Sequence, residues 1–324
     1  MVTQLTPPAD PIAPLLSGRK GRGDVASRLL TSAAGVFVLV LLAAIAVFLI
    51  AKAIPAFQDD KANFWGSKLW DPDNSKKFGI AALAFGTLET ALIALVIAWP
   101  IAMAVALFVA EYAPRRIAKI MGYLLDLLAA VPSVVYGLWG LVWLVPRLKG
   151  FQGWMGHHAS WIPIFKNRYA GLPTRSPFVV GVVLAIMILP IISAIIREIV
   201  IQADPAQKEA ALALGATKWE MIRIAVLPPS RSGIIGATIL GLGRALGETI
   251  AVALILASSF IVNTHIFEPG GNTIAGNIAV QFGEAGSLGR SALIASGLVL
   301  FAITLIVNFA ARLVISRSQK GAKA

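Results

Sequence analysis

Residues 177–229 read PFVVGVVLAIMILPIISAIIREIVIQADPAQKEAALALGATKWEMIRIAVLPP. The first part of this stretch is apolar, because the 21 residues between Arg175 and Arg197 carry no charge. A helix that crosses a bilayer needs about 20 such residues. The second part is polar and holds residues that are typical of helix ends. We therefore predict a transmembrane helix followed by a structured loop outside the membrane.

Apolar runs of similar length lie on both sides of this stretch. The run between Arg28 and Lys52 has 23 residues without a charge, and the run between Arg231 and Glu268 has 36 residues, of which only Arg244 and Glu248 are charged. These lengths predict an all-α integral membrane protein with six transmembrane helices. The six expected spans are 29–51, 80–109, 120–145, 177–199, 233–261 and 290–312.

The composition supports a membrane protein. Apolar residues make up 57% of the 324, charged residues only 14%, and the mean hydropathy is +0.79. Soluble domains carry about 25% charged residues, and a chain of this length cannot hide so much apolar surface in one core. The composition excludes a soluble enzyme and a disordered scaffold, and the absence of cysteine excludes disulfides and thiolate metal sites.

The chain has a net charge of +12, and the distribution of its cations along the sequence predicts the orientation in the membrane. Nucleic-acid binding would explain a basic chain, but cytoplasmic loops of membrane proteins also collect Lys and Arg. With both termini inside, 16 cations lie on inner segments and 11 on outer segments. We therefore expect cytoplasmic termini and no nucleic-acid partner.

The segments outside the spans differ in character. Residues 1–28 are expected to form a Pro-rich, basic cytoplasmic tail, since the apolar run behind them is too long for a cleaved signal peptide. Residues 52–77 are expected to be a solvated extracytoplasmic connection. Residues 147–176 are rich in aromatic residues, which fits an interfacial belt or a docking surface for an extracellular partner. Residues 317–324 form the C-terminal tail.

The loop 201–232 carries the clearest local signals. Asp204 before Pro205 is typical of a helix start, and Gly215 of a helix end. Thr217 and Glu220 have the spacing of a capping box. The spacing predicts one helix over 205–214 and a second from Lys218 to about Val226, with Pro228-Pro229 ending the second.

The second of these helices is expected to expose apolar side chains, namely those of Trp219, Met221, Ile222 and Val226. Such a surface fits an amphipathic hairpin that rests on lipid, and it fits a contact with a soluble partner equally well.

Two opposite charges lie within the fifth expected span. Arg244 is expected near the midplane, where a cation costs about 3 kcal/mol. Glu248 follows four residues later, so on a continuous helix both side chains share one face and can pair. The pair is either structural or part of a polar passage, and the second reading is favoured because a purely structural pair is replaceable by apolar residues.

Other polar residues in the spans are further candidates. Glu89 is expected to face the passage or to pair with Arg244, and Asp126 to reach toward Lys119 or Arg116. Three prolines are expected to kink their helices around a cavity, namely Pro100, Pro132 and Pro190.

The loop resembles the "EAA" loop of ABC-transporter import permeases. The matching residues are Glu209, Ala210, Ala211, Gly215, Leu227 and Pro228. Ala225 stands where that family usually has Ile or Val. The resemblance implies a type I ABC importer permease fold, with a permease core over 78–316. It also implies that the helix after Gly215, with Trp219, is the coupling helix that docks on an ATPase subunit.

Residues 243–249 read GRALGET and are similar to the signature of phosphate-import permeases of the ABC class. Such importers have two permease subunits, and the similarity is greater to the first (PstC-like) subunit than to its companion. The resemblance implies inorganic phosphate as substrate, with Arg244 and Glu248 in its pathway and Glu89 and Thr249 as further candidates. Glu248 is expected to hold Arg244 in place and to favour a protonated oxyanion over sulfate.

The resemblance also implies the partners. We expect a second permease subunit, two ATP-binding cassette subunits, an extracytoplasmic phosphate-binding protein and the lipid of a bacterial cytoplasmic membrane. The chain has no phosphate-binding G-x-x-x-x-G-K-[ST] loop. It is therefore expected to be no enzyme and to bind no cofactor or metal, while ATP and Mg²⁺ are used by the partner.

Three alternatives remain from the sequence. The chain is a permease for another oxyanion of the sulfate or molybdate class, a secondary anion transporter or channel, or a membrane enzyme of lipid-phosphate metabolism. The capped loop favours an ATP-driven importer over the last two, because neither needs a contact with an ATPase.

Overall fold

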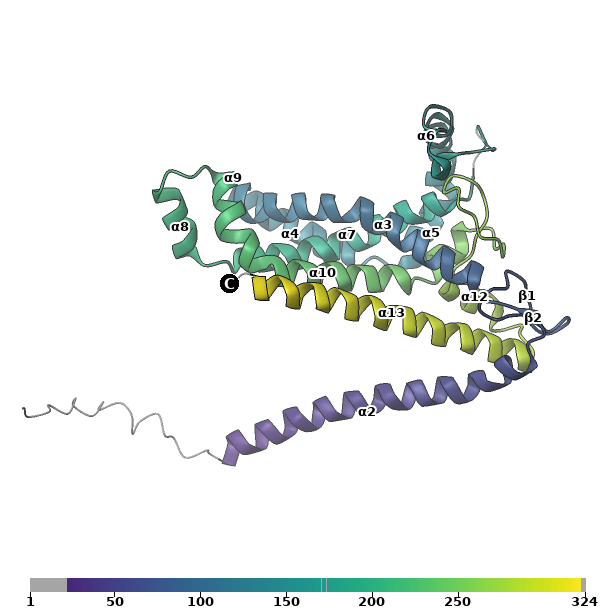
Figure 1. Ribbon diagram of the computed structural model, residues 1–324. Coiled ribbons are helices and arrows are strands. Elements are labelled where there is room, and N and C mark those ends of the chain that lie inside the picture. The colour runs from purple at the N-terminus through teal and green to yellow at the C-terminus, as the bar shows by residue number, and fades with distance from the viewer. Residues whose placement is uncertain (1–21, 170, 173, 322–324) are drawn as a thin grey trace, which may run out of the picture. The chain divides into compact units, whose positions relative to one another are not determined.

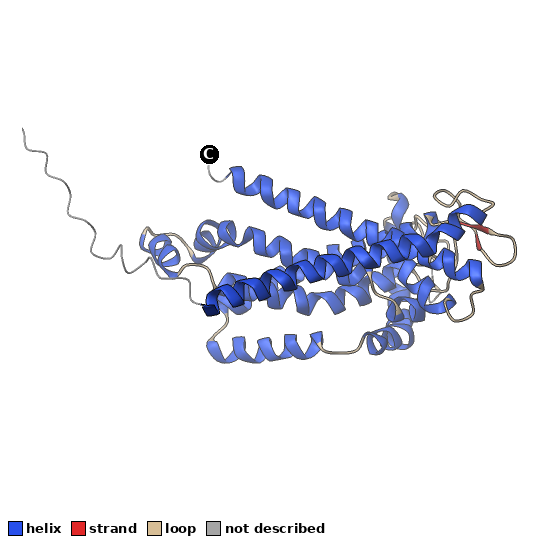
Figure 2. Ribbon diagram, turned by 90° about the horizontal axis from the view of Figure 1, so that it is seen from below, coloured by secondary structure: helices blue, strands red, loops and turns tan. Residues whose placement is uncertain are grey.

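The computed structural model describes residues 22–169, 171–172 and 174–321. Residues 1–21 of the expected N-terminal tail and 322–324 of the C-terminal tail lie outside the described residues. Backbone contacts divide the chain into two units, residues 1–51 and residues 52–324. Most of the described chain is helical, and its strands are confined to one short hairpin (Figure 2).

The described helices match the expected number of spans when one bent pair is counted as a single span. Five helical runs are long and apolar enough to cross a membrane. A sixth span is obtained if two helices joined by an 88° bend are counted as one. The runs are α2 (Arg22–Asp59), α3 with the π-turn η1 (Ala81–Leu107, Phe108–Tyr112), α7 (Pro177–Ile201), α9 through α10 (Lys218–Leu246) and α13 (Ser287–Gly321), and the bent pair is α4 (Arg115–Ala129) with the run from α5 to α6 (Ser133–His158).

Within residues 52–324, the helices α3, α7, α10 (Leu227–Leu246) and α13 run side by side (Figure 1). The short helices α8 (Pro205–Ala213) and α9 (Lys218–Met221) lie at one end of this bundle, which we call the loop end. The strands β1 (Trp70–Asp71) and β2 (Lys77–Phe78) lie at the other, the strand end, together with α6 (Val145–His158) and α12 (Ile274–Gln281).

Helix α7 is the centre of the bundle because it is apolar on nearly every side. Its residues are buried against alanines of α3, which allow the two helices to approach closely. A Cβ atom on Gly181 would lie only 2.3 Å from Cγ2 of Ile93 on α3. Small residues at such a crossing are the usual means of close packing between membrane helices.

The three expected proline kinks have different outcomes. The kink at Pro132 is confirmed, since α4 ends at Ala129, α5 (Ser133–Trp139) begins after Pro132, and the chain bends by 88° between them. Pro100 lies inside α3 and Pro190 inside α7, and both of these helices continue through their proline.

The fifth span is built differently from the expected continuous helix over 233–261. Helix α10 ends at Leu246, the short helix α11 (Ile250–Ile255) follows, and residues 256–273 form an irregular segment before α12. Gly247 is the C-cap residue of α10, and its N–H donates to the carbonyl of Gly243 at 3.2 Å. Glycine has no Cβ and leaves helical geometry at little cost.

Residues 52–77 are exposed at most positions, as expected of a solvated connection, but they are also folded. Phe64, Trp70 and Phe78 are buried in a second apolar core, in which they meet Leu293 of α13. The Asp73 carboxylate accepts hydrogen bonds from the backbone N–H groups of Gly286 and Gly289 at 2.9 Å each, beside the start of α13. The segment is therefore a folded cap on the strand end.

Gly181→Ala should destabilise the bundle because the added methyl group has no room between α3 and α7. Overpacking of this kind costs about 1–3 kcal/mol. Thermal unfolding of the purified chain in detergent measures the loss. Gly35→Ala in α2 is the matched control, since nothing lies within 4 Å of its Cβ position. Equal unfolding temperatures for the two variants would contradict the packing described here.

Candidate functional site

The loop between α7 and α10 has the local structure that its sequence predicts. Asp204 caps α8, with its Oδ1 accepting from the N–H of Ala206 at 2.9 Å. Gly215 has a φ of +85°, a conformation that favours glycine. Thr217 and Glu220 form the complete capping box at the start of α9. The predicted helix–glycine–helix arrangement is confirmed.

The prediction that Pro228-Pro229 ends the second helix is wrong. The chain passes from α9 through the π-turn η4 (Ile222–Val226) directly into α10, whose first turn contains both prolines. A proline lacks the backbone N–H, and in the first turn of a helix that N–H has no helical partner in any case. The prolines therefore begin α10.

The apolar surface of this loop consists of other residues than expected, apart from Trp219. Met221, Ile222 and Val226 are buried in the main core, so the expectation that they are exposed is wrong. Ala225 is buried with them. The exposed apolar side chains are those of Leu214 (89%), Trp219 (55%), Ile224 and Leu212.

The remaining residues of the EAA-like pattern lie on the same loop. Glu209, Ala210, Gly215 and Pro228 are exposed, and Ala211 and Leu227 are half-buried against the core.

Arg244 and Glu248 do not form the expected pair. Glu248 lies beyond the end of α10, and the described chain holds no ion pair between the two residues. Instead, Glu248 is buried and its Oε1 accepts from the N–H of Ala251 at 3.2 Å, in the first turn of α11. Spacing of four residues brings side chains together only while the helix continues, and the break at Gly247 removes that condition.

Arg244 lines an open cavity of about 520 Å³ between three helices. This volume is in the range of small-molecule sites, about 300–1,000 Å³. Asn308 of α13 is a second polar side chain on its wall. The other lining residues are Ile191 of α7 and Gly236, Ile239, Leu240 and Gly243 of α10.

The glycines of α10 serve two faces of the helix. Cβ atoms on Gly233 and Gly241 would collide with Ile199 and Ile192 of α7, so these two positions allow the helices to approach. Gly236 and Gly243 have nothing within 4 Å of their Cβ positions, and both line the cavity. The cavity is open beside Arg244 because these two residues have no side chain.

The other candidate pathway residues are not gathered around Arg244. Glu89 is half-buried on α3 and forms no ion pair with Arg244, so that alternative is absent from the structure. Thr249 is the N-cap residue of α11 but makes no side-chain capping bond. Asp126 is exposed on α4, and none of the ion pairs of the described residues joins it to Lys119 or Arg116. Asn308 was missed by the sequence analysis, although a polar residue in an otherwise apolar span is a detectable signal.

The aromatic segment 147–176 is folded against the irregular segment 256–273 at the strand end. Phe165 stacks on Phe267 at a centroid distance of 5.6 Å, and Phe151 meets the same Phe267 edge-on at 6.4 Å. Trp154 and Trp161 remain exposed.

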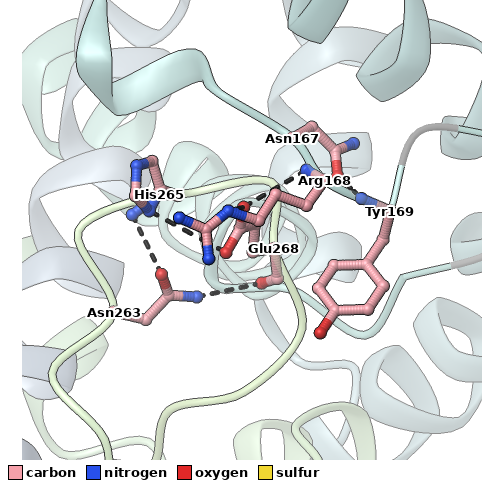
Figure 3. A network of polar contacts seen from close by, with 6 residues as sticks. All are labelled: Asn167, Arg168, Tyr169, Asn263, His265 and Glu268. Atoms are coloured by element: carbon pink, nitrogen blue, oxygen red, sulfur yellow. Dashed lines mark hydrogen bonds and ion pairs between the residues drawn. The ribbon is translucent and has the colours of Figure 1, made fainter.

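Polar contacts join the same two segments (Figure 3). Glu268 accepts from the backbone N–H of Arg168 at 3.2 Å and lies 3.8 Å from the ring Nδ1 of His265. Asn263 donates to the backbone carbonyl of Glu268 at 3.3 Å. The residues that the structure describes hold no group of three or more side chains suited to a metal ion.

Comparisons with known proteins agree with this architecture. Residues 101–320 match the family described as binding-protein-dependent transport system inner membrane component. The chain is 42% identical over 317 residues to the phosphate transport system permease protein PstC 2 of Mycobacterium tuberculosis, covering 96% of this chain and 97% of the relative. It is 40% identical to the permease protein PstC of Xylella fastidiosa, over 92% of each chain.

Solved structures show the same fold at low sequence identity. A bacterial ABC transporter for import of the polysaccharide alginate matches with a TM-score of 0.53 at 18% identity, over 90% of this chain and 97% of that chain. The inward-facing methionine ABC transporter MetNI matches with a TM-score of 0.53 at 15% identity, over 73% and 96%. With its family match and its relatives at 40% identity or more, the chain belongs to the inner membrane components of binding-protein-dependent transport systems.

Proposed function

We propose that this chain is the permease subunit of an ATP-driven importer that moves inorganic phosphate across the bacterial cytoplasmic membrane. The relatives named PstC support this substrate. The observation that carries the proposal is Arg244, a cation that lines the cavity and takes part in no ion pair of the described chain. A guanidinium presents paired N–H donors that suit a phosphate oxyanion.

The loop end of the bundle faces the cytoplasm in this proposal, because ATP is available there. Two ATP-binding cassette subunits dock on the coupling loops of this chain and of a second permease subunit. Exposed Leu214 and Trp219 supply the apolar contact, and exposed Glu209 lies on the same loop. The chain itself performs no chemistry, and the partner subunits hydrolyse ATP with Mg²⁺. Both termini then lie in the cytoplasm.

The strand end faces outward and receives an extracytoplasmic phosphate-binding protein. The described residues of 52–77, 147–176 and 256–273 form a folded cap at this end, which supports this role. The first segment is held by the second apolar core, and the other two are joined by the Phe165–Phe267 stacking and the bond from Arg168 to Glu268. Exposed Trp161 and Arg168 lie on it.

Glu248 acts on the pathway by shaping the chain rather than by pairing with Arg244. Its carboxylate caps the first turn of α11, which fixes the break that follows Arg244. Glu248 does not line the cavity, so the preference of the site for protonated phosphate over sulfate depends on Arg244 and Asn308 instead. These two residues supply the charged and the amide side chain on the cavity wall.

Replacing Arg244 should abolish phosphate transport without loss of assembly. In Arg244→Ala the cavity loses its cation, and in Arg244→Lys a point charge replaces the two-pronged donor, so uptake should be lost in the first and reduced in the second. Uptake of radiolabelled phosphate by the reconstituted complex measures this, with sulfate as competitor. Arg290→Ala, at an exposed arginine of α13, should transport like the parent. Normal uptake by Arg244→Ala would refute the assignment.

Leu214→Asp and Trp219→Ala should weaken the contact with the ATPase while the chain still folds, because both side chains project from the core. Buried anchor residues of an interface contribute about 2 kcal/mol or more, so a loss of roughly thirtyfold in affinity is expected. Co-purification of the ATPase with a tagged chain measures it. Trp161→Ala, 80% exposed at the strand end, is the control. Undiminished co-purification would refute the contact at these two residues, and ATP-independent transport by the chain alone would favour a channel.

A further inference from the structure

The π-turn η1 ends helix α3 at the loop end of the bundle. Its residues are Phe108 to Tyr112, and it closes with a bond from the N–H of Ala113 to the carbonyl of Phe108 at 2.8 Å. Such widened turns are rare and occur often at functional sites. Two neighbouring residues of this turn, Glu111 and Tyr112, contact the two helices of the coupling loop.

Glu111 holds α8 by a short ion pair. Lys208 Nζ lies 2.6 Å from Glu111 Oε1, and the same amino group donates to the carbonyl of Val200 in α7 at 3.3 Å. The side chain of Glu111 is 9% exposed and that of Lys208 is 19% exposed. A pair so far removed from water is strongly affected by the loss of either partner, because the other charge is left buried.

Tyr112 holds α9 by a different interaction. The amino group of Lys218, the first residue of α9, lies 4.8 Å from the centre of the Tyr112 ring, within the range of a cation–π contact. Consecutive side chains of a helix point in different directions. The turn η1 therefore contacts both helices of the coupling loop, α8 through Glu111 and α9 through Tyr112.

The other end of α3 contacts the irregular segment before α12. The Thr87 hydroxyl accepts from the backbone N–H of Ile274 at 3.0 Å. A Cβ atom on Gly86 would lie 2.2 Å from the carbonyl oxygen of Asn272, so the two backbones touch there. From Thr87 to Glu111 the helix spans about 36 Å, at about 1.5 Å per residue. A single helix thus links the coupling loop with the strand end.

We propose that η1 fastens the coupling loop to α3, through Glu111–Lys208 and Tyr112–Lys218, so that the loop and this helix move as one body during transport. Movement imposed on the loop by the ATPase then reaches the segment 272–274 at the opposite face through Gly86 and Thr87. Glu111, Tyr112, Lys208 and Lys218 are positioning residues that act through α3 and do not touch the substrate. This inference rests on the function proposed above, since it takes the loop as the ATPase contact.

The proposed attachment of the loop to α3 is tested by the coupling efficiency of the complete complex, that is, the phosphate transported per ATP hydrolysed. The complex with its partner subunits is reconstituted in proteoliposomes, and inorganic phosphate transported per ATP hydrolysed is measured. Glu111→Gln and Lys208→Met should each lower this ratio about two- to thirtyfold, the range found for mutations along coupling networks, with the ATPase subunit still co-purifying. Lys208→Arg should retain the parental ratio. The double variant should be no worse than either single variant, because one contact is already lost.

Glu284→Gln is the matched control, an exposed carboxylate outside these contacts, and it should transport like the parent. A parental ratio in Glu111→Gln, or additive losses in the double variant, would overturn the proposal. So would a fall in transport that only follows loss of the ATPase subunit.

A distance measurement separates this proposal from the proposed function. The chain has no cysteine, so Ala104→Cys on α3 and Gln207→Cys on α8 introduce two unique labelling sites, both exposed. Spin labels at these positions should give the same distance distribution with and without ATP in the parental complex. A distribution that shifts with ATP would overturn the fastening whatever the substrate. Failure of the parental complex to accumulate phosphate, with the distance unchanged, would refute only the phosphate assignment.

Discussion

The structure depends on one constraint, which is that every backbone polar group within a bilayer needs a partner from the protein. The break between α10 and α11 would violate it without specific side chains. Glu248 accepts from the N–H of Ala251 at the start of α11, and Arg175 donates to the carbonyls of Leu254 and Ile255 at its end. Two charged residues thus cap a helix of six residues. The cavity beside Arg244 lies on the α10 side of this break and is open because Gly236 and Gly243 have no side chain.

The local signals in the sequence were sufficient for the coupling loop. Asp204, Gly215 and the pair Thr217–Glu220 act on backbone groups at most three residues away. Their effects do not depend on the rest of the fold, so they predicted the starts of both helices and the turn between them, but not the end of the second helix. The number of spans was predictable for a similar reason, since the length of an apolar run is a property of the run alone.

Features that depend on distant partners were not predictable. The burial of Met221 and Val226 requires the end of α7, with which they share a core. The capping of α11 requires Arg175, which in the sequence is only the boundary of a span. The cap formed by 52–77 requires Gln281, which accepts from the indole of Trp70 at 2.6 Å. The pairing of Arg244 with Glu248 failed because the break at Gly247 is specified by these distant contacts rather than by the four-residue spacing.

In the part of the chain that the structure describes, Arg244 is left without a carboxylate partner because Glu248 bonds to the backbone of α11. An arginine at the centre of a transmembrane helix costs about 2.5–3.5 kcal/mol on the insertion scale. Arg244 lies in the last turn of α10, where the helix dipole returns about 0.3–1 kcal/mol. An ion pair with Glu248 would have offset the remainder, but that carboxylate is occupied by α11. The rest of the cost is therefore not recovered among the described residues of this chain. In the function proposed above, a bound oxyanion recovers it only while it occupies the cavity, which is the behaviour that a transport site requires.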